Sequence, residues 1–182
     1  TNRLVELWKN SSDPEWPWFE SSATYDNARL CQALILSGKA MPESGASEIA
    51  LASLRWLASL QTRQAGHFRP IGSNGFCVRG GARADFDQQP VEAQAMVSAC
   101  LTAFSVTKDA SWSSQAKLAF EWFLGRNDLG VPLYDSKSGG CGDGLHVDRV
   151  SENQGAESTL AFHLALAEMK RADNLVEMPV RS

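Results

Sequence analysis

The chain has little net charge, few cysteines and no long apolar run, and each shortage excludes a class of protein. Its 17 basic and 21 acidic residues give a formal net charge of −4 over 182 residues. Without a basic stripe to neutralise phosphates, nucleic acid is not expected as a partner. No apolar run reaches the length of a transmembrane helix, so no membrane partner is expected either. The hydrophobic content of 43% is that of an ordinary folded domain.

The four cysteines do not suggest a disulfide framework. Cys31 and Cys100 fall within apolar helical patterns, where a free cysteine behaves as a small hydrophobic residue. Cys77 and Cys141 lie in glycine-rich loops and could pair, although nothing in the sequence requires it. A reducing, cytoplasmic location is therefore expected.

Signals for a metal or a cofactor are weak. Cys141, Asp143 and His146 could be drawn as one metal-binding run, but no partner cluster accompanies them. No strand-turn-helix unit with a glycine-rich phosphate turn is present to bind a nucleotide. We therefore expect neither a metal nor a cofactor.

Helical periodicity dominates the chain. Three expected helices are apolar on nearly every face, which is typical of buried helices: residues 24–38, 89–106 and 155–171. Two further helices, at residues 44–61 and 110–124, place their apolar residues opposite a polar side.

This alternation predicts an all-α fold of three α-hairpins. Three inner helices would lie side by side, with about three outer helices behind them. Residues 4–9 would form the last turns of one outer helix, and Asp109 would cap the helix at residues 110–124. Little strand is expected, in short pieces near residues 68–71 and 76–78. We expect a single helical domain over residues 1–182.

Polar clusters begin the three buried helices at the same phase. Asn27, Glu92 and Glu157 follow one another at intervals of 65 residues, and a fixed period is the signature of a repeat architecture. Long loops lead into all three helix starts: residues 10–23, 62–88 and 125–153. Loops longer than about 12–15 residues are usually functional or disordered. The rim formed by these helix starts is therefore the expected site.

Residues 16–20 (Trp-Pro-Trp-Phe-Glu) and 25–29 (Tyr-Asp-Asn-Ala-Arg) resemble the six-hairpin glycosidase superfamily, the (α/α)6 toroids. The resemblance is more specific to the helical domain associated with bacterial family-4-type glycosyltransferases. Residues 86–93 and 153–158 extend it over most of the chain. It implies a partial toroid, the C-terminal half of a larger (α/α)6 domain with three hairpins of six. Toroids of this kind include hydrolases, lyases, epimerases and binding modules.

Four acids are the candidate catalytic residues, because glycoside cleavage uses a pair of carboxyl groups. Glu92 and Glu157 lie one turn inside buried helices, where desolvation would raise the pKa and suit a general acid. Asp26 and Asp87 lie at or before helix starts, where backbone amides would keep them ionised as bases. The alternative is structural: Asp87 as a helix cap, and the other acids as ties between helix ends.

Aromatic faces can stack on sugar rings while amides and carboxylates bind hydroxyl groups. On this basis the expected substrate-binding residues are Trp16, Trp18, Glu20, Tyr25, Asn27, Arg29, Gln88, Gln89, Asp143, Asn153 and Gln154. For Trp16 and Trp18 the alternative is that they cover the core. Four basic residues of the second long loop could bind an acidic sugar or a phosphate, or could pair with nearby aspartates: His67, Arg69, Arg79 and Arg83.

The sequence therefore supports two alternative functions. The first is a carbohydrate-active helical domain, hydrolytic or otherwise glycosyl-processing. The second is a non-catalytic glycan-binding or docking module of a glycosyltransferase, so the sequence leaves open whether the protein is an enzyme. The expected partners are a saccharide, a glycosyltransferase domain, and a missing toroid half or a second copy, because a half-toroid would expose an apolar side.

Overall fold

The computed structural model describes residues 1–177, and this part of the chain is predominantly helical, as the sequence predicts. Its elements in chain order are α1 (Asn2–Ser11), β1 (Ser22–Ala23), α2 (Ala28–Ala40), the 3₁₀ turn η1 (Pro42–Ser44), α3 (Ala46–Leu60), β2 (Cys77–Val78), α4 (Pro90–Thr107), α5 (Ala110–Phe123) and α6 (Ala156–Glu177).

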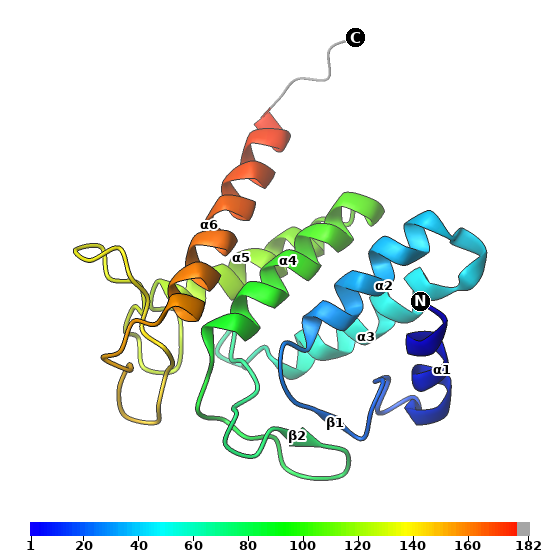
Figure 1. Cartoon of the computed structure of the whole chain (residues 1–182), viewed down its shortest axis with the longest axis horizontal. Helices are drawn as coiled ribbons and strands as arrows, with labels where there is room; N and C mark the ends of the chain where they lie inside the picture. The colour runs from blue at the N-terminus through cyan, green and yellow to red at the C-terminus, as the bar shows by residue number, and fades with distance from the viewer. Residues whose placement is uncertain (178–182) are drawn as a thin grey trace.

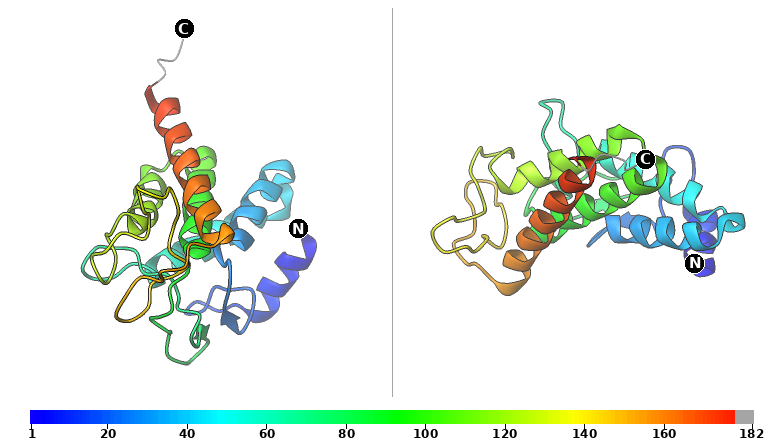
Figure 2. Two further views of the ribbon diagram at one scale, coloured as in Figure 1. Left: turned by 60° about the vertical axis from the view of Figure 1, so that its left-hand side comes forward. Right: turned by 90° about the horizontal axis from the view of Figure 1, so that it is seen from above.

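The helices form two layers. In Figure 1, α4 lies between α2 and α6, and these three helices form one row. Helix α3 packs behind α2 and α5 behind α4, as the view from above in Figure 2 shows, while α1 contacts α3. The row begins at one end of the molecule, where the long loops also lie (Figure 1). We call this end, made by the N-terminal ends of α2, α4 and α6 with the loops that lead into them, the rim.

Helix α4 is the centre of the hydrophobic core. Its residues 92–100 are all buried, and most of them are small or apolar. Small side chains let neighbouring helices approach closely, and larger residues such as Leu34, Leu54 and Phe123 fill the remaining space with 0% exposure. Complete burial of one such side chain stabilises the fold by about 1.5–3 kcal/mol.

Helix α6 is buried on one face only, whereas the sequence predicts burial all round. Ala161, Phe162 and Ala165 face the core, but Leu160 and Leu164 are 59% and 52% exposed. The reason is positional: α6 is the last helix of the row, so it packs against α4 and α5 and has no neighbour on its other flank within residues 1–177. Apolar composition alone does not reveal such an edge.

The caps and the small sheet differ in detail from the prediction. Asp109 caps α5 as expected, since its carboxylate accepts a hydrogen bond from the Ser111 amide at 3.0 Å. Asp87 does not cap α4; Gln89 occupies that position, ahead of Pro90 in the first turn. The antiparallel sheet pairs β2 with β1, and the sequence gives no sign of β1.

All four cysteines are buried and free, so Cys77 and Cys141 do not form a disulfide. No helix within residues 1–177 combines the length and the apolar character needed to cross a membrane.

Candidate functional site

Glu92 joins two helix starts at the rim. It lies in the first turn of α4 and is only 3% exposed. Its carboxylate accepts hydrogen bonds from the Asp26 backbone amide and from Asn27 Nδ2, the latter at 3.1 Å. Two members of the 65-residue series, Asn27 and Glu92, are therefore in direct contact, and the contact ties α4 to α2.

Burial dominates the ionisation of Glu92. Removal from water raises its pKa to about 7, although the hydrogen bonds from Asn27 and the Asp26 amide favour the charged form. The carboxyl group therefore exchanges a proton near neutral pH. This is the shift that the sequence predicts for Glu92.

Tyr25 joins the segment before α2 to α6. Its hydroxyl donates a hydrogen bond to Glu157 Oε1 at 2.9 Å. Burial and this hydrogen bond raise the pKa of Tyr25 to about 12, so the hydroxyl stays protonated as a donor. Glu157 is exposed, against the prediction of a desolvated carboxyl, because α6 is the edge of the row.

Asp26, the third acid at the rim, is half-buried. Its backbone has φ = 52°, which few residues other than glycine adopt and which aspartate tolerates better than most. Its Oδ1 accepts no hydrogen bond and lies 3.5 Å from Arg29 Nε. Burial raises the pKa of Asp26; the Arg29 guanidinium opposes this and the Glu157 carboxylate adds to it. The sequence predicts an ionised Asp26 at the helix start; burial shifts its pKa upward, and its role as a base stays a prediction.

These contacts define the rim cluster: Tyr25, Asp26, Asn27, Arg29, Glu92 and Glu157. Three of the four predicted catalytic acids belong to it. Glu157 is exposed to solvent, Asp26 is half-buried, and Glu92 is buried. The cluster thus combines a buried tie with two accessible carboxyl groups.

Asp87 does not belong to the rim cluster. Its carboxylate pairs with His146 Nδ1 at 2.7 Å. The neighbouring Gln88 is buried, where it accepts a hydrogen bond from Trp122 Nε1 at 2.7 Å and donates one to Asp128 Oδ2 at 2.6 Å. Gln89 is the N-terminal cap residue of α4. Asp87 and Gln88 therefore link the segment before α4 to other loops, and the catalytic role of Asp87 and the substrate-binding role of Gln88 and Gln89 stay predictions.

The loop before α6 is held by Asp143. Its carboxylate accepts hydrogen bonds from Ser158 Oγ and the Gly155 amide, both at 2.6 Å, and from Asn153 Nδ2. The Ser158 hydrogen bond is the largest cause of its lowered pKa. Gln154 accepts a hydrogen bond from Ser138 at 2.7 Å. Asp143, Asn153 and Gln154 therefore take part in hydrogen bonds within the loops, and their substrate-binding role stays a prediction.

The rim tryptophans are core residues. Trp16 and Trp18 are 7% and 1% exposed, and both rings pack against Trp56, with centroid distances of 4.8 and 5.4 Å. Trp16 also donates a hydrogen bond to the Glu20 carbonyl at 2.7 Å, while Glu20 itself is exposed. With their faces covered, these rings cannot stack on a sugar, and the alternative that they cover the core is the correct one.

The basic loop forms a buried network around a residue that the sequence analysis missed. Arg69 donates two hydrogen bonds to Asp128, at 2.6 and 2.7 Å, and His67 Nε2 lies 3.0 Å from the same carboxylate. Arg83 donates to the backbone carbonyls of Leu60, Arg69 and Pro70. Asp128 sits in a polar turn that carries no motif, so no signal in the sequence marks it.

Metal binding finds no support in the described residues, because no three His, Cys, Asp or Glu side chains within them are grouped as ligands. Comparison with known proteins adds no family: no protein-family model matches the chain, and no curated protein matches it.

Proposed function

We propose that the rim cluster binds a saccharide and that this domain binds or processes a glycan. The observation that carries the proposal is the hydrogen bond from the exposed Tyr25 to the exposed Glu157, which places a second carboxyl group near the half-buried Asp26. Tyr25 and Asp26 are adjacent and Glu157 lies far from them in sequence, and the hydrogen bond from the Asp26 amide to Glu92 holds the Tyr25–Asp26 segment in place. Carboxylates with an aromatic side chain are a common means of binding sugars.

The same pair can perform glycoside hydrolysis. Asp26, whose pKa burial raises above its usual value, is the acid that donates a proton to the departing glycosidic oxygen. Glu157, oriented by Tyr25, accepts a proton from the water that attacks the anomeric carbon. The glycosidic bond breaks as the bond to water forms, so the atoms balance without a cofactor. Glu92 acts through the position of Asp26 rather than on the substrate.

The resemblance to six-hairpin toroids supports this proposal. The row of α2, α4 and α6 with α3 and α5 behind it is compatible with part of such a toroid. The larger toroid, a glycosyltransferase domain as partner, a second copy and a cytoplasmic location all stay predictions.

A second candidate is the non-catalytic glycan-binding or docking module. The observation in its favour is that Glu92 and Glu157 both take part in hydrogen bonds between helices. A carboxylate used as a tie is less free to exchange protons with a substrate.

The test uses Asp26→Asn with a screen of mono- and oligosaccharides, including mannosides and glucosides. We expect at least one saccharide to raise the melting temperature of the wild-type protein. The variant should bind that saccharide about tenfold more weakly or worse, because a hydrogen bond from the carboxyl group to the sugar is lost. Its melting temperature without ligand should be nearly unchanged, because the Asp26 carboxyl accepts no hydrogen bond.

Asp148→Asn is the matched control, since Asp148 is 65% exposed and pairs only with its neighbour Arg149. Product formed by the wild type and lost in Asp26→Asn would identify an enzyme. Stabilisation without product would identify the binding module. If no saccharide stabilises the wild type, the proposed function is wrong.

A further inference from the structure

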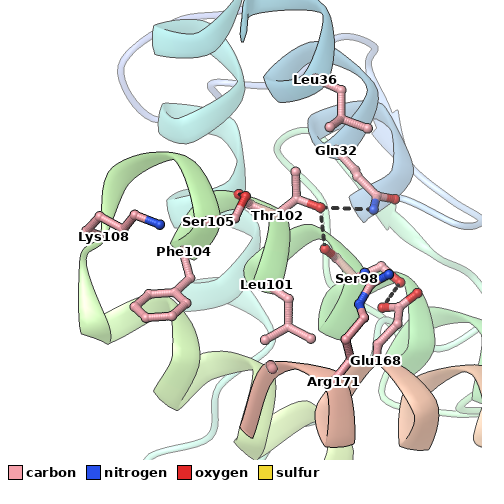
Figure 3. Close-up of a pocket in the computed structure, with 11 residues that line it drawn as sticks. Gln32, Leu36, Ser98, Leu101, Thr102, Phe104, Ser105, Lys108, Glu168 and Arg171 are labelled. Carbon is pink, nitrogen blue, oxygen red and sulfur yellow. Dashed lines mark hydrogen bonds between the residues drawn. The ribbon is translucent and has the colours of Figure 1, made fainter. Parts of the chain in front are cut away.

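A groove opens between α2, α4 and α6 on the side of the row away from the outer layer, with a cavity volume of about 460 Å³ (Figure 3). This size lies in the range of small-molecule sites, about 300–1,000 Å³. Its polar lining includes Gln32, Ser98, Thr102 and Glu168, and its apolar lining includes Leu101 and Phe104. None of the rim acids lines it.

A polar stripe runs along α4 into this groove. Gln94, Ser98 and Thr102 are four residues apart, so they share one face of the helix. Gln94 and Ser98 are only 3% and 2% exposed, in a helix whose other buried residues are mostly small and apolar. Buried polar groups lower stability unless they are hydrogen-bonded, so the stripe requires polar partners on the helices beside α4.

Hydrogen bonds extend the stripe to both neighbouring helices. Ser98 Oγ donates to Glu168 Oε2 of α6 at 2.5 Å, and Gln32 Nε2 of α2 donates to Thr102 Oγ1 at 3.1 Å (Figure 3). Gln94 Nε2 donates to Ser98 Oγ at 2.9 Å. The groove therefore has a fixed polar floor that joins all three helices of the row.

Arg29 connects this floor to the rim cluster. Its guanidinium donates to Gln94 Oε1 and, at 2.7 Å, to Gln32 Oε1, while its Nε lies 3.5 Å from Asp26 Oδ1. A path of partly exposed polar residues therefore leads from Asp26 through Arg29 and Gln32 to Thr102 in the groove. From Glu92 to Ser105 the helix rises about 20 Å, at roughly 1.5 Å per residue. One sugar ring is too short to cover this path.

We infer that the groove and the rim cluster form one extended site for an oligosaccharide chain, with one end at the rim acids and the rest along the polar stripe of α4. Hydroxyl, amide and carboxylate groups of the floor bind sugar hydroxyls, and Leu101 and Phe104 offer apolar surface to ring faces. The inference rests on the proposed function and adds the length of the ligand to it.

The test uses Ser105→Trp and a series of gluco- and manno-oligosaccharides of increasing length. Ser105 is exposed and lines the groove, and its hydroxyl donates only to the Thr102 carbonyl of its own helix, at 2.8 Å. The wild type should bind longer chains more tightly than monosaccharides. Because the indole fills the groove, the variant should lose about tenfold in affinity for long chains and keep its affinity for monosaccharides.

Ser114→Trp on α5 is the matched control, because Ser114 is also exposed and donates to a carbonyl of its own helix, that of Ala110, at 3.3 Å. It should leave every affinity unchanged. Thr102→Val, which keeps the side-chain shape and removes the hydroxyl, should weaken only long chains and covers the case in which Ser105→Trp does not fold.

Three outcomes would overturn the inference while leaving the proposed function intact: affinity independent of chain length, equal weakening of short and long ligands by Ser105→Trp, or a change in oligomeric state with unchanged saccharide affinity. The absence of binding by any saccharide would instead contradict the proposed function itself.

Discussion

Replacing Asp128 with alanine should lower the free energy of unfolding by about 3–5 kcal/mol, because it leaves a buried cation without its main partner. Arg69 is 8% exposed at its side chain and gives two hydrogen bonds to Asp128, while its other partner, Asp85, is half exposed. Gln88 Nε2 loses one of its two acceptors and keeps the Asp85 carbonyl, and through Gln88 the network reaches Trp122. Urea unfolding followed by tryptophan fluorescence would measure the loss.

Asp148→Ala is the control, since its ion pair with Arg149 is exposed and should contribute less than about 1 kcal/mol. The pH dependence provides a second check. Burial raises the pKa of Asp128, but the hydrogen bonds from Arg69, His67 and Gln88 outweigh it and hold the pKa at about 2. The stability from the ionised group is thus present above pH 3.8 and lost as the pH falls toward 2. Equal stability of the two variants would show that the network contributes little.

The Glu92→Gln protein should lose most of the change in stability that the wild type shows between pH 4.5 and pH 7. The pKa of Glu92 is raised from 4.5 to about 7 by burial, so the folded protein binds a proton more tightly than the unfolded chain. This contribution is fully present below pH 4.5 and is lost as the pH rises through 7. At about 1.4 kcal/mol per pKa unit, it amounts to about 3 kcal/mol.

The measurement is the free energy of unfolding at several pH values for the wild type, Glu92→Gln and the control Glu152→Gln, whose side chain is exposed in the loop before α6. The control should follow the wild type. A Glu92→Gln protein with the same pH slope as the wild type would mean that Glu92 is ionised throughout, and that its hydrogen bonds from Asp26 and Asn27 outweigh its burial.

The helices were predictable because the hydrophobic effect imposes a period on the sequence. Helix α4 is apolar on nearly every face and is the most enclosed element, and Asp109 begins α5 as its residue type predicts. The environment of α6 was not predictable in the same way. Its sequence resembles that of α4, and only its place at the edge of the row leaves Leu160 and Leu164 exposed.

Part of the site followed from the repeat phase. Residues at equal phase in a repeat lie at equal heights, and this brought Asn27 to Glu92. The repeat phase did not predict the direction in which each side chain points. Asp87 turns to His146, a residue 59 positions away that no period links to it. Asp26 has a positive φ and donates its amide to the Glu92 carboxylate, a partner that only the folded chain brings to it.

The polar stripe of α4 was visible in the sequence. Gln94, Ser98 and Thr102 recur at helical spacing inside an apolar helix, which is a signal for a buried polar function. The stripe lies inside α4, away from the helix starts where the sequence places the expected site.

The central position of α4 also determines how the molecule opens. A helix enclosed by α2, α5 and α6 can expose its backbone amides only when the whole domain unfolds. The amides of α1 and of the outer flank of α6 have fewer neighbours to displace. Amide hydrogen exchange should therefore be slowest in α4, at a free energy equal to that of global unfolding, and faster in α1 and on the outer flank of α6.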